Sequence, residues 1–316
     1  MTDSRTLNIT NGDTLTERLV EQKFEGDILT WSEMLCEGPT TEFIGTSTYF
    51  ELRKKFFNDY YDLILDEEKF HIDLQKLDNT ENYDQIVLWF EYDLFCHINM
   101  LAVLSLIKQK NIDVPVYLVC SGYTEGHTLV GLSELSDKSL KKHFDSKIKL
   151  TFDDLELGYT LWRIYCGKDH NLLKPYITSK SSFQYLSPCL KAHLKRFPDS
   201  KTGLDVLETN ILTLIDKNSI NSEHHLLGYI LNYQGYYGYG DMQLKRMISK
   251  LSHFFSIVDD KLKLNEMGYK ALSSKFNFSI MINDNIMFGG INKLDYQFSV
   301  KENKLIKPKF NATTSF

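Results

Sequence analysis

The sequence has no long hydrophobic run, and its first residues are polar, so we expect neither a membrane-spanning helix nor a signal peptide. No stretch of the 316 residues approaches the roughly 18 uninterrupted apolar residues that a membrane-spanning helix requires. The first seven residues lack the apolar core of a signal peptide. We therefore predict a cytoplasmic protein with no membrane partner.

Cysteine is also scarce. The five cysteines are widely separated, odd in number and form no C-x-x-C motif, which excludes a disulfide framework and a zinc ribbon. We expect most of them to be small buried apolar residues. They are Cys36, Cys96, Cys120, Cys166 and Cys189.

Several catalytic signatures are missing as well. The chain contains no G-x-S-x-G, H-E-x-x-H or protein-kinase motif, so common serine hydrolases, zincins and protein kinases are excluded. The segment N-G-D at 11–13 falls short of a Walker loop or a G-x-G-x-x-G fingerprint. No standard motif therefore identifies the chemistry.

The sequence does contain enough apolar residues for a large core. Its charges are unevenly distributed between the two halves. Hydrophobic residues make up 42% and charged residues 25% of the chain, as expected for a folded protein. Residues 1–150 hold 15 Lys and Arg against 26 Asp and Glu, a net charge of −11, whereas residues 151–316 hold 21 against 16, a net charge of +5. The two halves are thus expected to have different partners.

The pattern of residues 1–130 predicts an α/β domain. Four β-prone runs alternate with amphipathic or apolar helical stretches, and the run at 86–90 is continuously apolar, as expected of a central strand. This alternation predicts a Rossmann-like parallel sheet with right-handed crossovers. The four runs lie at 7–10, 28–31, 86–90 and 114–119.

The rest of the chain predicts two further units. Residues 131–200 show helical periodicity, and the Pro/Gly cluster at 198–203 favours a domain boundary. In residues 201–316, three short helices, a hairpin at 257–264 and a helix at 265–272 follow in the order of a winged helix, with further strands near the C-terminus. We therefore predict a helical middle and a winged-helix-like C-terminal domain.

The ends of the predicted strands carry polar residues. Since ligands bind beyond the carboxyl ends of parallel strands, we expect a crevice there for a small phosphorylated or nucleotide-type ligand. Its ligand-binding candidates are Asn11, Gly12, Asp13, Glu37, Ser121 and Gly122. Asp13, Glu91 and Asp93 are the candidate ligands of Mg²⁺ or Mn²⁺, because clustered carboxylates repel one another unless a cation or a proton compensates them.

Three further residues suggest metal-dependent phosphoryl transfer or hydrolysis. Glu33 would act as a base or support a metal ligand, and Arg53 would neutralise a ligand oxyanion. His97 lies four residues after Asp93, so the pair could share a helix face as a base and its orienting group. The alternatives are helix caps or solvated loop residues for the carboxylates and a hydrogen-bonded core position for His97.

A second hypothesis is a ligand-sensing regulator that binds DNA or protein through its C-terminal domain. Lys245, Arg246 and Lys250 lie on the third helix of that domain, and Lys261 and Lys263 lie on the hairpin, where they could contact phosphates. The alternative is a solvated basic face. The third hypothesis is a protein with a purely structural role in interactions.

Five separated segments resemble one bacterial family, the domains of unknown function numbered 1835. They are 7–14 (LNITNGDT), 28–39 (ILTWSEMLCEGP), 86–95 (IVLWFEYDLF), 131–135 (GLSEL) and 190–203 (LKAHLKRFPDSKTG). The resemblance spans nearly the whole chain and implies no activity, since that family has none assigned. The chain departs from the family pattern at Cys96 and His97, where an acidic residue and Gln are usual.

Overall fold

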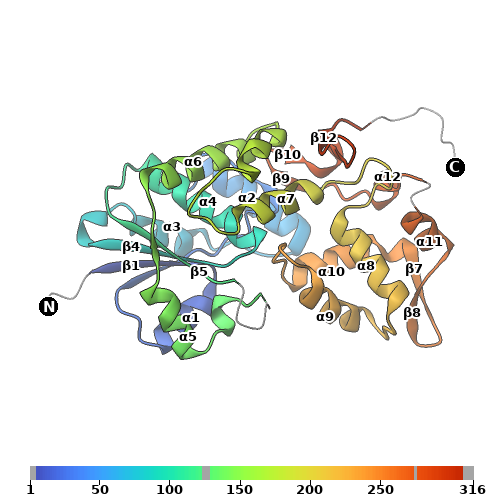
Figure 1. The fold of residues 1–316 in the computed structure, drawn as a ribbon, viewed down its shortest axis with the longest axis horizontal. Helices are drawn as coiled ribbons and strands as arrows, with labels where there is room; N and C mark the ends of the chain where they lie inside the picture. Colours follow the sequence, from blue (N-terminus) through green and yellow to red (C-terminus); the bar gives the residue numbers. More distant parts are fainter. Residues whose placement is uncertain (1–4, 123–128, 274–275, 309–316) are drawn as a thin grey trace.

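A five-stranded sheet organises the first half of the chain (Figure 1). In this computed structural model, which describes residues 5–122, 129–273 and 276–308, the strand order is β2-β1-β4-β5-β6. The first four strands are parallel and β6 is antiparallel. The strands are β1 Thr6–Thr10, β2 Asp27–Thr30, β4 Gln85–Phe90, β5 Val116–Cys120 and β6 Ile148–Lys149. The α/β class and the mostly parallel sheet are confirmed, whereas β6 lies in a segment that we expected to be helical.

Helices cover both faces of this sheet (Figure 1). On one face, Val87 and Trp89 of β4 join a small apolar cluster with α1 (Asp13–Glu21) and α5 (Asp137–Asp145). On the other face, the alternate β4 residues Ile86, Leu88 and Phe90 belong to a much larger cluster. Each face of the central strand is therefore buried, which explains its unbroken apolar sequence.

The larger cluster is built around α4 (Leu94–Gln109), which is buried on almost every side. Helix α6 (Phe152–Cys166) packs against it, and a Cβ at Gly158 of α6 would lie only 2.7 Å from the side chain of Leu104. The two helix axes therefore approach closely because residue 158 has no side chain. Helices α2 (Ser47–Tyr61), α3 (Glu67–Gln75) and α7 (Leu186–Lys195) complete this half.

The C-terminal part follows the predicted order of three helices, a hairpin and a helix. These elements are α8 Val206–Lys217, α9 Glu223–Tyr233, α10 Asp241–Lys250, β7 Phe255–Val258, β8 Lys261–Leu264 and α11 Glu266–Leu272. Helix α12 and short strands follow, as α12 Ser279–Ile282, β9 Met287–Gly289, β10 Ile291–Asn292, β11 Gln297–Ser299 and β12 Lys304–Ile306.

The predicted units share one apolar core. The large cluster of buried residues runs from Leu7 to Leu305 and includes side chains from all three. Strand β3 (Gly38–Pro39), in the loop after β2, pairs with β9 near the C-terminus. Among the described residues, no helix combines the length and the apolar character needed to cross a bilayer.

Candidate functional site

The sheet has its topological switch point between β1 and β4. From β1 the chain crosses to β2 on one side, and from β4 it crosses to β5 on the other. In open α/β sheets the carboxyl ends of two such strands border the usual ligand crevice. Asn11 follows β1 and Glu91 follows β4, so both lie at this point, and Ser121 follows the next strand, β5.

Glu91, Asp93 and Cys96 come together here. One donor atom from each lies within 4.8 Å of the others, the only such group of potential metal ligands in the described part of the chain. Oδ1 of Asp93 accepts a hydrogen bond from the backbone N–H of Cys96 at 2.8 Å and so caps α4. Oε1 of Glu91 accepts from the backbone N–H of Leu132 at 2.6 Å. The proximity of Glu91 and Asp93 follows from their positions at one strand end.

Burial makes both carboxyl groups reluctant to ionise. It raises the pKa of Glu91 to about 7, with a further contribution from the charge of Asp93. It also raises the pKa of Asp93 to about 6, although backbone N–H groups oppose the change. No Lys or Arg of the described residues forms an ion pair with either group. The site therefore favours an added positive charge, either a proton or a cation.

Asn11 links this cluster to the loop after β2. Its Nδ2 donates to Sγ of Cys96 at 3.0 Å, and its Oδ1 accepts from Nδ2 of Asn99 at 2.8 Å. Asn99 also donates to the carbonyl of Glu33 and accepts from the N–H of Leu35. The sequence analysis did not single out Asn99. The one indication of its role was a polar amide side chain within an otherwise apolar helix.

The two helices that begin at this edge have different N-termini. The first N–H groups of α4, those of Leu94 and Phe95, donate to the carbonyls of Tyr236 and Tyr237, so this end is closed. By contrast, α1 begins after Gly12 without a side-chain cap. Gly12 has φ of 93°, and a Cβ there would meet no atom within 4 Å. The open helix end is thus that of α1, next to Asn11.

Asp13 lies apart from the other candidate metal ligands, contrary to our prediction. It is exposed and forms an ion pair with Lys69 of α3 at 3.3 Å. It lines a separate pocket of about 340 Å³ between the ends of β1 and β2 and helix α3. The predicted set of Asp13, Glu91 and Asp93 is corrected to Glu91, Asp93 and Cys96, because the first turn of α1 carries Asp13 toward α3.

His97 occupies a core position. Its Nδ1 bonds to the backbone carbonyl of Asp93 at 2.9 Å, not to the carboxylate that we expected it to share. Burial lowers the pKa of His97 to about 4, so the imidazole is neutral at pH 7. The predicted pairing of base and orienting carboxylate is therefore not formed.

Glu33 and Arg53 form a buried ion pair instead of facing a ligand. Nη2 of Arg53 lies 2.9 Å from Oε2 of Glu33, and neither side chain is exposed. Nε also donates to the Glu33 carboxylate, and the other N–H groups of Nη1 and Nη2 donate to the carbonyls of Met34, Glu37 and Pro39. All the donors of Arg53 are thus used within the protein, which leaves none for a ligand oxyanion. The pair holds the loop after β2 in shape.

Ser121 and Gly122 follow β5 and differ in their surroundings. Oγ of Ser121 is buried and has no hydrogen-bond partner among the described residues, although buried hydroxyls are usually paired. A Cβ at Gly122 would collide with the hydroxyl of Tyr185, so this glycine accommodates a neighbouring ring. Of these two residues, Ser121 is the one whose side chain could still hydrogen-bond to a ligand.

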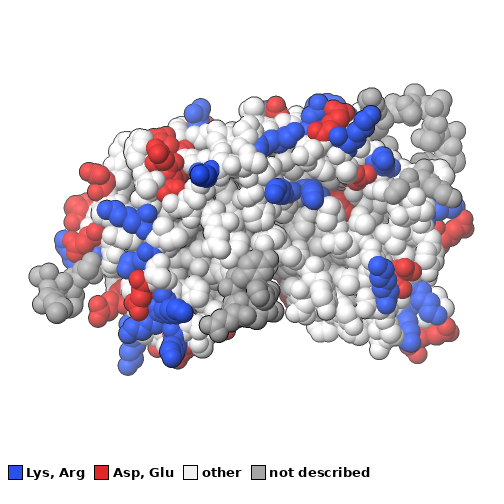
Figure 2. All heavy atoms as spheres, in the orientation of Figure 1, with Lys and Arg blue, Asp and Glu red and all other residues white. Residues whose placement is uncertain are grey.

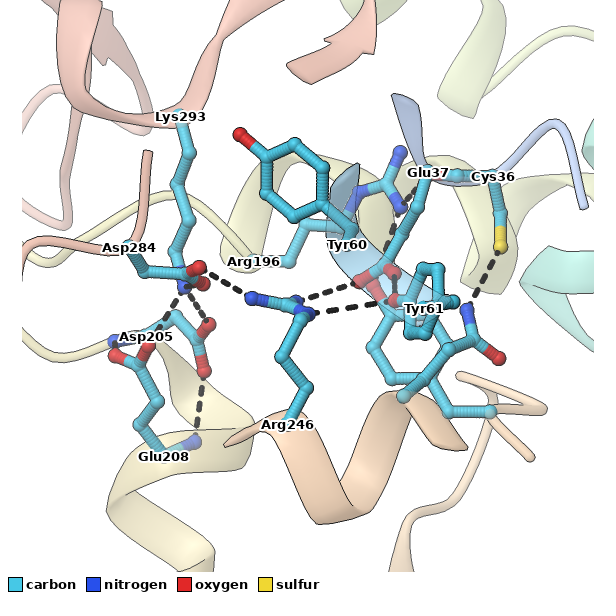
Figure 3. A network of polar contacts seen from close by, with 12 residues as sticks. Cys36, Glu37, Tyr60, Tyr61, Arg196, Asp205, Glu208, Arg246, Asp284 and Lys293 are labelled. Carbon is cyan, nitrogen blue, oxygen red and sulfur yellow. Dashed lines mark hydrogen bonds and ion pairs between the residues drawn. The ribbon is translucent and has the colours of Figure 1, made fainter. Parts of the chain in front are cut away.

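Glu37 and Arg246 belong to an interior network rather than to the predicted sites (Figure 3). Arg246 of α10 bonds to Glu37 at 3.0 Å and to Asp284, and Glu37 also accepts from the hydroxyl of Tyr61. Glu37 is therefore unavailable to a ligand and Arg246 to a DNA phosphate. Their ion pair joins the loop after β2 to the C-terminal part of the chain.

The same network continues to a buried lysine (Figure 3). Nζ of Lys293 lies 2.8 Å from Asp205, 2.6 Å from Glu208 and 2.9 Å from Asp284. Although burial opposes ionisation, Lys293 and Arg246 hold the pKa of Asp284 well below its usual range. Burial and the neighbouring Asp205 raise the pKa of Glu208 to about 7.

The other candidate nucleic-acid residues lie at the surface. Lys245, Lys261 and Lys263 are exposed, and Lys250 is half-buried. Lys263 pairs with Asp259 at 3.0 Å, Lys245 lies 3.9 Å from Asp241, and Lys250 donates to the carbonyl of Asn283. These lysines remain candidates for phosphate contacts after Arg246 is removed from the set.

No protein-family model matches this chain, and no curated protein matches it. The resemblance to the family numbered 1835 therefore stays a prediction.

Proposed function

We propose that the protein binds a divalent cation, Mg²⁺ or Mn²⁺, together with a small phosphorylated or nucleotide-type ligand at the switch point of its sheet. The observation that carries the proposal is the group of half-buried Glu91 with buried Asp93 and Cys96, in which one ligand atom of each residue lies within 4.8 Å of the others. Two carboxylates without a Lys or Arg partner among the described residues are suited to a hard cation.

The neighbouring polar groups favour binding of the phosphorylated part of the ligand. The N-terminus of α1 has no side-chain cap, and Gly12 leaves open space beside it. Helix N-termini attract anions because their first N–H groups are unpaired and the helix dipole is positive there. Asn11 lies between this helix end and Cys96, so cation and phosphate would be neighbours.

As an enzyme, the protein would transfer or hydrolyse a phosphoryl group. The cation would neutralise developing charge on the phosphoryl oxygens, and Glu91 and Asp93 would hold it in place. Glu33, Arg53 and His97 would act only by holding the surrounding backbone, because each bonds within the protein.

Thermal unfolding with Mg²⁺, Mn²⁺ or Zn²⁺ tests the cation. A ligand that binds only the folded state raises the melting temperature, so Mg²⁺ or Mn²⁺ should raise that of the native chain but not those of Glu91→Gln and Asp93→Asn. Asp93→Asn is a matched change because Asn also caps helices well. Asp13→Asn should keep the response, and an unchanged melting temperature with every cation would overturn the proposal.

Cys96→Ser identifies the kind of cation. If only the carboxylates and water hold Mg²⁺ or Mn²⁺, this variant keeps the shift. A shift produced by Zn²⁺ alone and lost in Cys96→Ser would mean that sulfur is a ligand and would replace our choice of metal. Release of phosphate from nucleotides, dependent on the cation and lost in Asp93→Asn, would establish turnover.

A second candidate function is contact with DNA or protein through the C-terminal part. The order of α8, α9, α10, the β7–β8 hairpin and α11 favours a winged-helix-like unit, with exposed lysines on α10 and the hairpin. Salt-dependent binding to duplex DNA that is lost in the triple variant Lys245→Glu, Lys261→Glu, Lys263→Glu would support it. Arg246 is left unchanged in this test because its ion pairs hold the interior network.

A further inference from the structure

A groove lies at the amino end of the sheet, opposite the candidate site. The first residues of β1 and β4, Thr6 and Gln85, line it together with the end of α1 and helix α5. Its volume is about 630 Å³. This is within the roughly 300–1,000 Å³ typical of sites for nucleotide-sized ligands.

Four lysines surround this groove: Lys23, Lys138, Lys141 and Lys147. Lys138, Lys141 and Lys147 belong to a local excess of positive charge, since residues 137–149 contain five Lys and two Asp in a half of the chain whose net charge is −11. Figure 2 shows Lys and Arg side chains gathered at the lower left of the molecule, over α1 and α5. The basic surface thus stands out against an acidic background.

The acidic residues of the groove compensate the lysines only in part. Asp137 is bound to Arg18, which leaves Glu25 and Asp145 against the four lysines. On α5, Lys138 and Lys141 are three residues apart and both exposed, so their ammonium groups lie on neighbouring turns of one face. A partner with regularly spaced negative charges would complement this face.

Aromatic rings line the same groove. The rings of Phe24 and Phe144 are half-buried, meet edge to face at 5.2 Å and rest on Trp89, which is parallel to Phe144 within 4°. The ammonium of Lys147 lies 4.4 Å from the centre of the Phe144 ring, where a flexible side chain can give way to a stacked base. Aromatic rings between cations are typical of surfaces that bind single-stranded nucleic acids.

We propose that the groove between the end of α1 and helix α5 binds single-stranded nucleic acid, with lysines contacting phosphates and the phenylalanine rings contacting bases. The proposal is independent of the cation site, which lies at the other end of the strands. It also differs from the C-terminal DNA contact considered above, because it uses another surface and another form of nucleic acid.

Fluorescence anisotropy with the full-length chain and a labelled dT12 strand, without divalent cations, tests this surface. Four phosphate contacts should give a slope of about −3 for the logarithm of the binding constant against that of the salt concentration. The triple variant Lys23→Glu, Lys138→Glu, Lys141→Glu should bind at least tenfold more weakly. Its matched control, Lys180→Glu, Lys191→Glu, Lys301→Glu, carries the same change in charge at exposed positions outside both candidate nucleic-acid surfaces and should bind as the native chain does.

A strand of the same length without bases separates nucleic acid from a general polyanion. The strand without bases keeps every phosphate. If it binds at least fivefold more weakly than dT12, the bases contribute to binding. Equal binding of the two strands would overturn the proposal, as would equal losses in the two triple variants or no binding of dT12 at all. Thermal unfolding of both variants checks that these exposed substitutions leave the fold intact.

Discussion

The carboxylates at the strand ends, half-buried Glu91 and buried Asp93, have different partners from the buried carboxylates around Lys293. Asp205, Glu208 and Asp284 share the ammonium of Lys293, and Arg246 bridges Asp284 to Glu37. Among the described residues, Glu91 and Asp93 have only backbone donors and one thiol nearby. In the described part of the chain, cations thus accompany the acids of the interior network, and none accompanies the two acids at the switch point.

This difference explains the contrast in proton affinity. Asp284, between two cations, has a pKa held well below its usual range, whereas burial raises the pKa of Asp93 to about 6. Both groups pay the cost of desolvation, and only the interior network compensates it with side chains. Among the described residues, Glu91 and Asp93 have no Lys or Arg partner although the interior network pairs each of its carboxylates with one, which is a strong reason to expect a ligand there.

The largest effect should follow removal of Lys293. Lys293→Met leaves three buried carboxylates without their shared ammonium, which should lower the free energy of unfolding by about 3–5 kcal/mol. Urea denaturation at pH 7 measures the change. Lys245→Met, on an exposed face of α10, is the control and should change stability by less than about 0.5 kcal/mol. A small loss at Lys293 would mean that these acids are protonated and need no cation.

Removal of Arg246 should cost less, about 2–4 kcal/mol, because Lys293 still contacts Asp284 and Tyr61 still donates to Glu37. Arg246→Met measured by urea denaturation tests this. Adding Glu37→Gln should recover part of the loss, since it removes one of the two charges that were left unpaired. Strictly additive losses would show that the two side chains do not interact.

At the strand ends, removal of the charged side chains should raise the free energy of unfolding instead of lowering it. Because the pKa values of Glu91 and Asp93 are raised in the folded state, that state binds more protons than the unfolded chain between about pH 4 and pH 7. These groups therefore make the cation-free protein less stable as the pH rises through this window. Glu91→Gln with Asp93→Asn should flatten that slope and stabilise the chain at pH 8 by on the order of 1–2 kcal/mol.

Urea denaturation between pH 4 and pH 8, in the presence of a chelator, measures this slope. Glu17→Gln, at an exposed position of α1, should leave it unchanged. An unaltered slope in the double variant would mean that Glu91 and Asp93 ionise normally, and the contrast with Lys293 would disappear. Saturating cation should remove the destabilisation at pH 8 in the native chain only.

The smallest effect is expected for Asp13. Its ion pair with Lys69 is more than half exposed on both sides, so Asp13→Asn should change the free energy of unfolding by less than about 0.5 kcal/mol. The same urea measurement applies. A loss as large as that of Lys293→Met would mean that Asp13 has buried partners, and it would return this residue to the set of candidate ligands.

The sequence predicted the parts of this architecture that depend on local pattern. Strands β1, β2, β4 and β5 were found because their apolar runs are short and end at polar residues. Glu91 and Asp93 were correctly expected to be neighbours, since both follow one strand. Asp13 was misplaced because its partner helix α3 has a largely polar sequence that gave little periodic signal.

Long-range polar partners could not be read from the sequence. Arg53 was expected to neutralise a ligand oxyanion, but it pairs with the carboxylate of Glu33 and keeps no donor for a ligand. Arg246 resembled its neighbour Lys245 in the sequence, yet one turns inward to Glu37 and the other outward to solvent. Which of two adjacent cations is buried depends on how α10 packs against residues 200 positions away.

The segment from Tyr236 to Gly238 connects the two halves at the candidate site. Its carbonyls receive the first N–H groups of α4, and a Cβ at Gly238 would overlap the carboxyl group of Asp93. A compound that binds Asp93 must therefore also act on the connection between α9 and α10. If such a compound changes the affinity of a second partner for that connection, thermodynamic linkage requires that the partner change the affinity of the compound for the Asp93 site by the same factor.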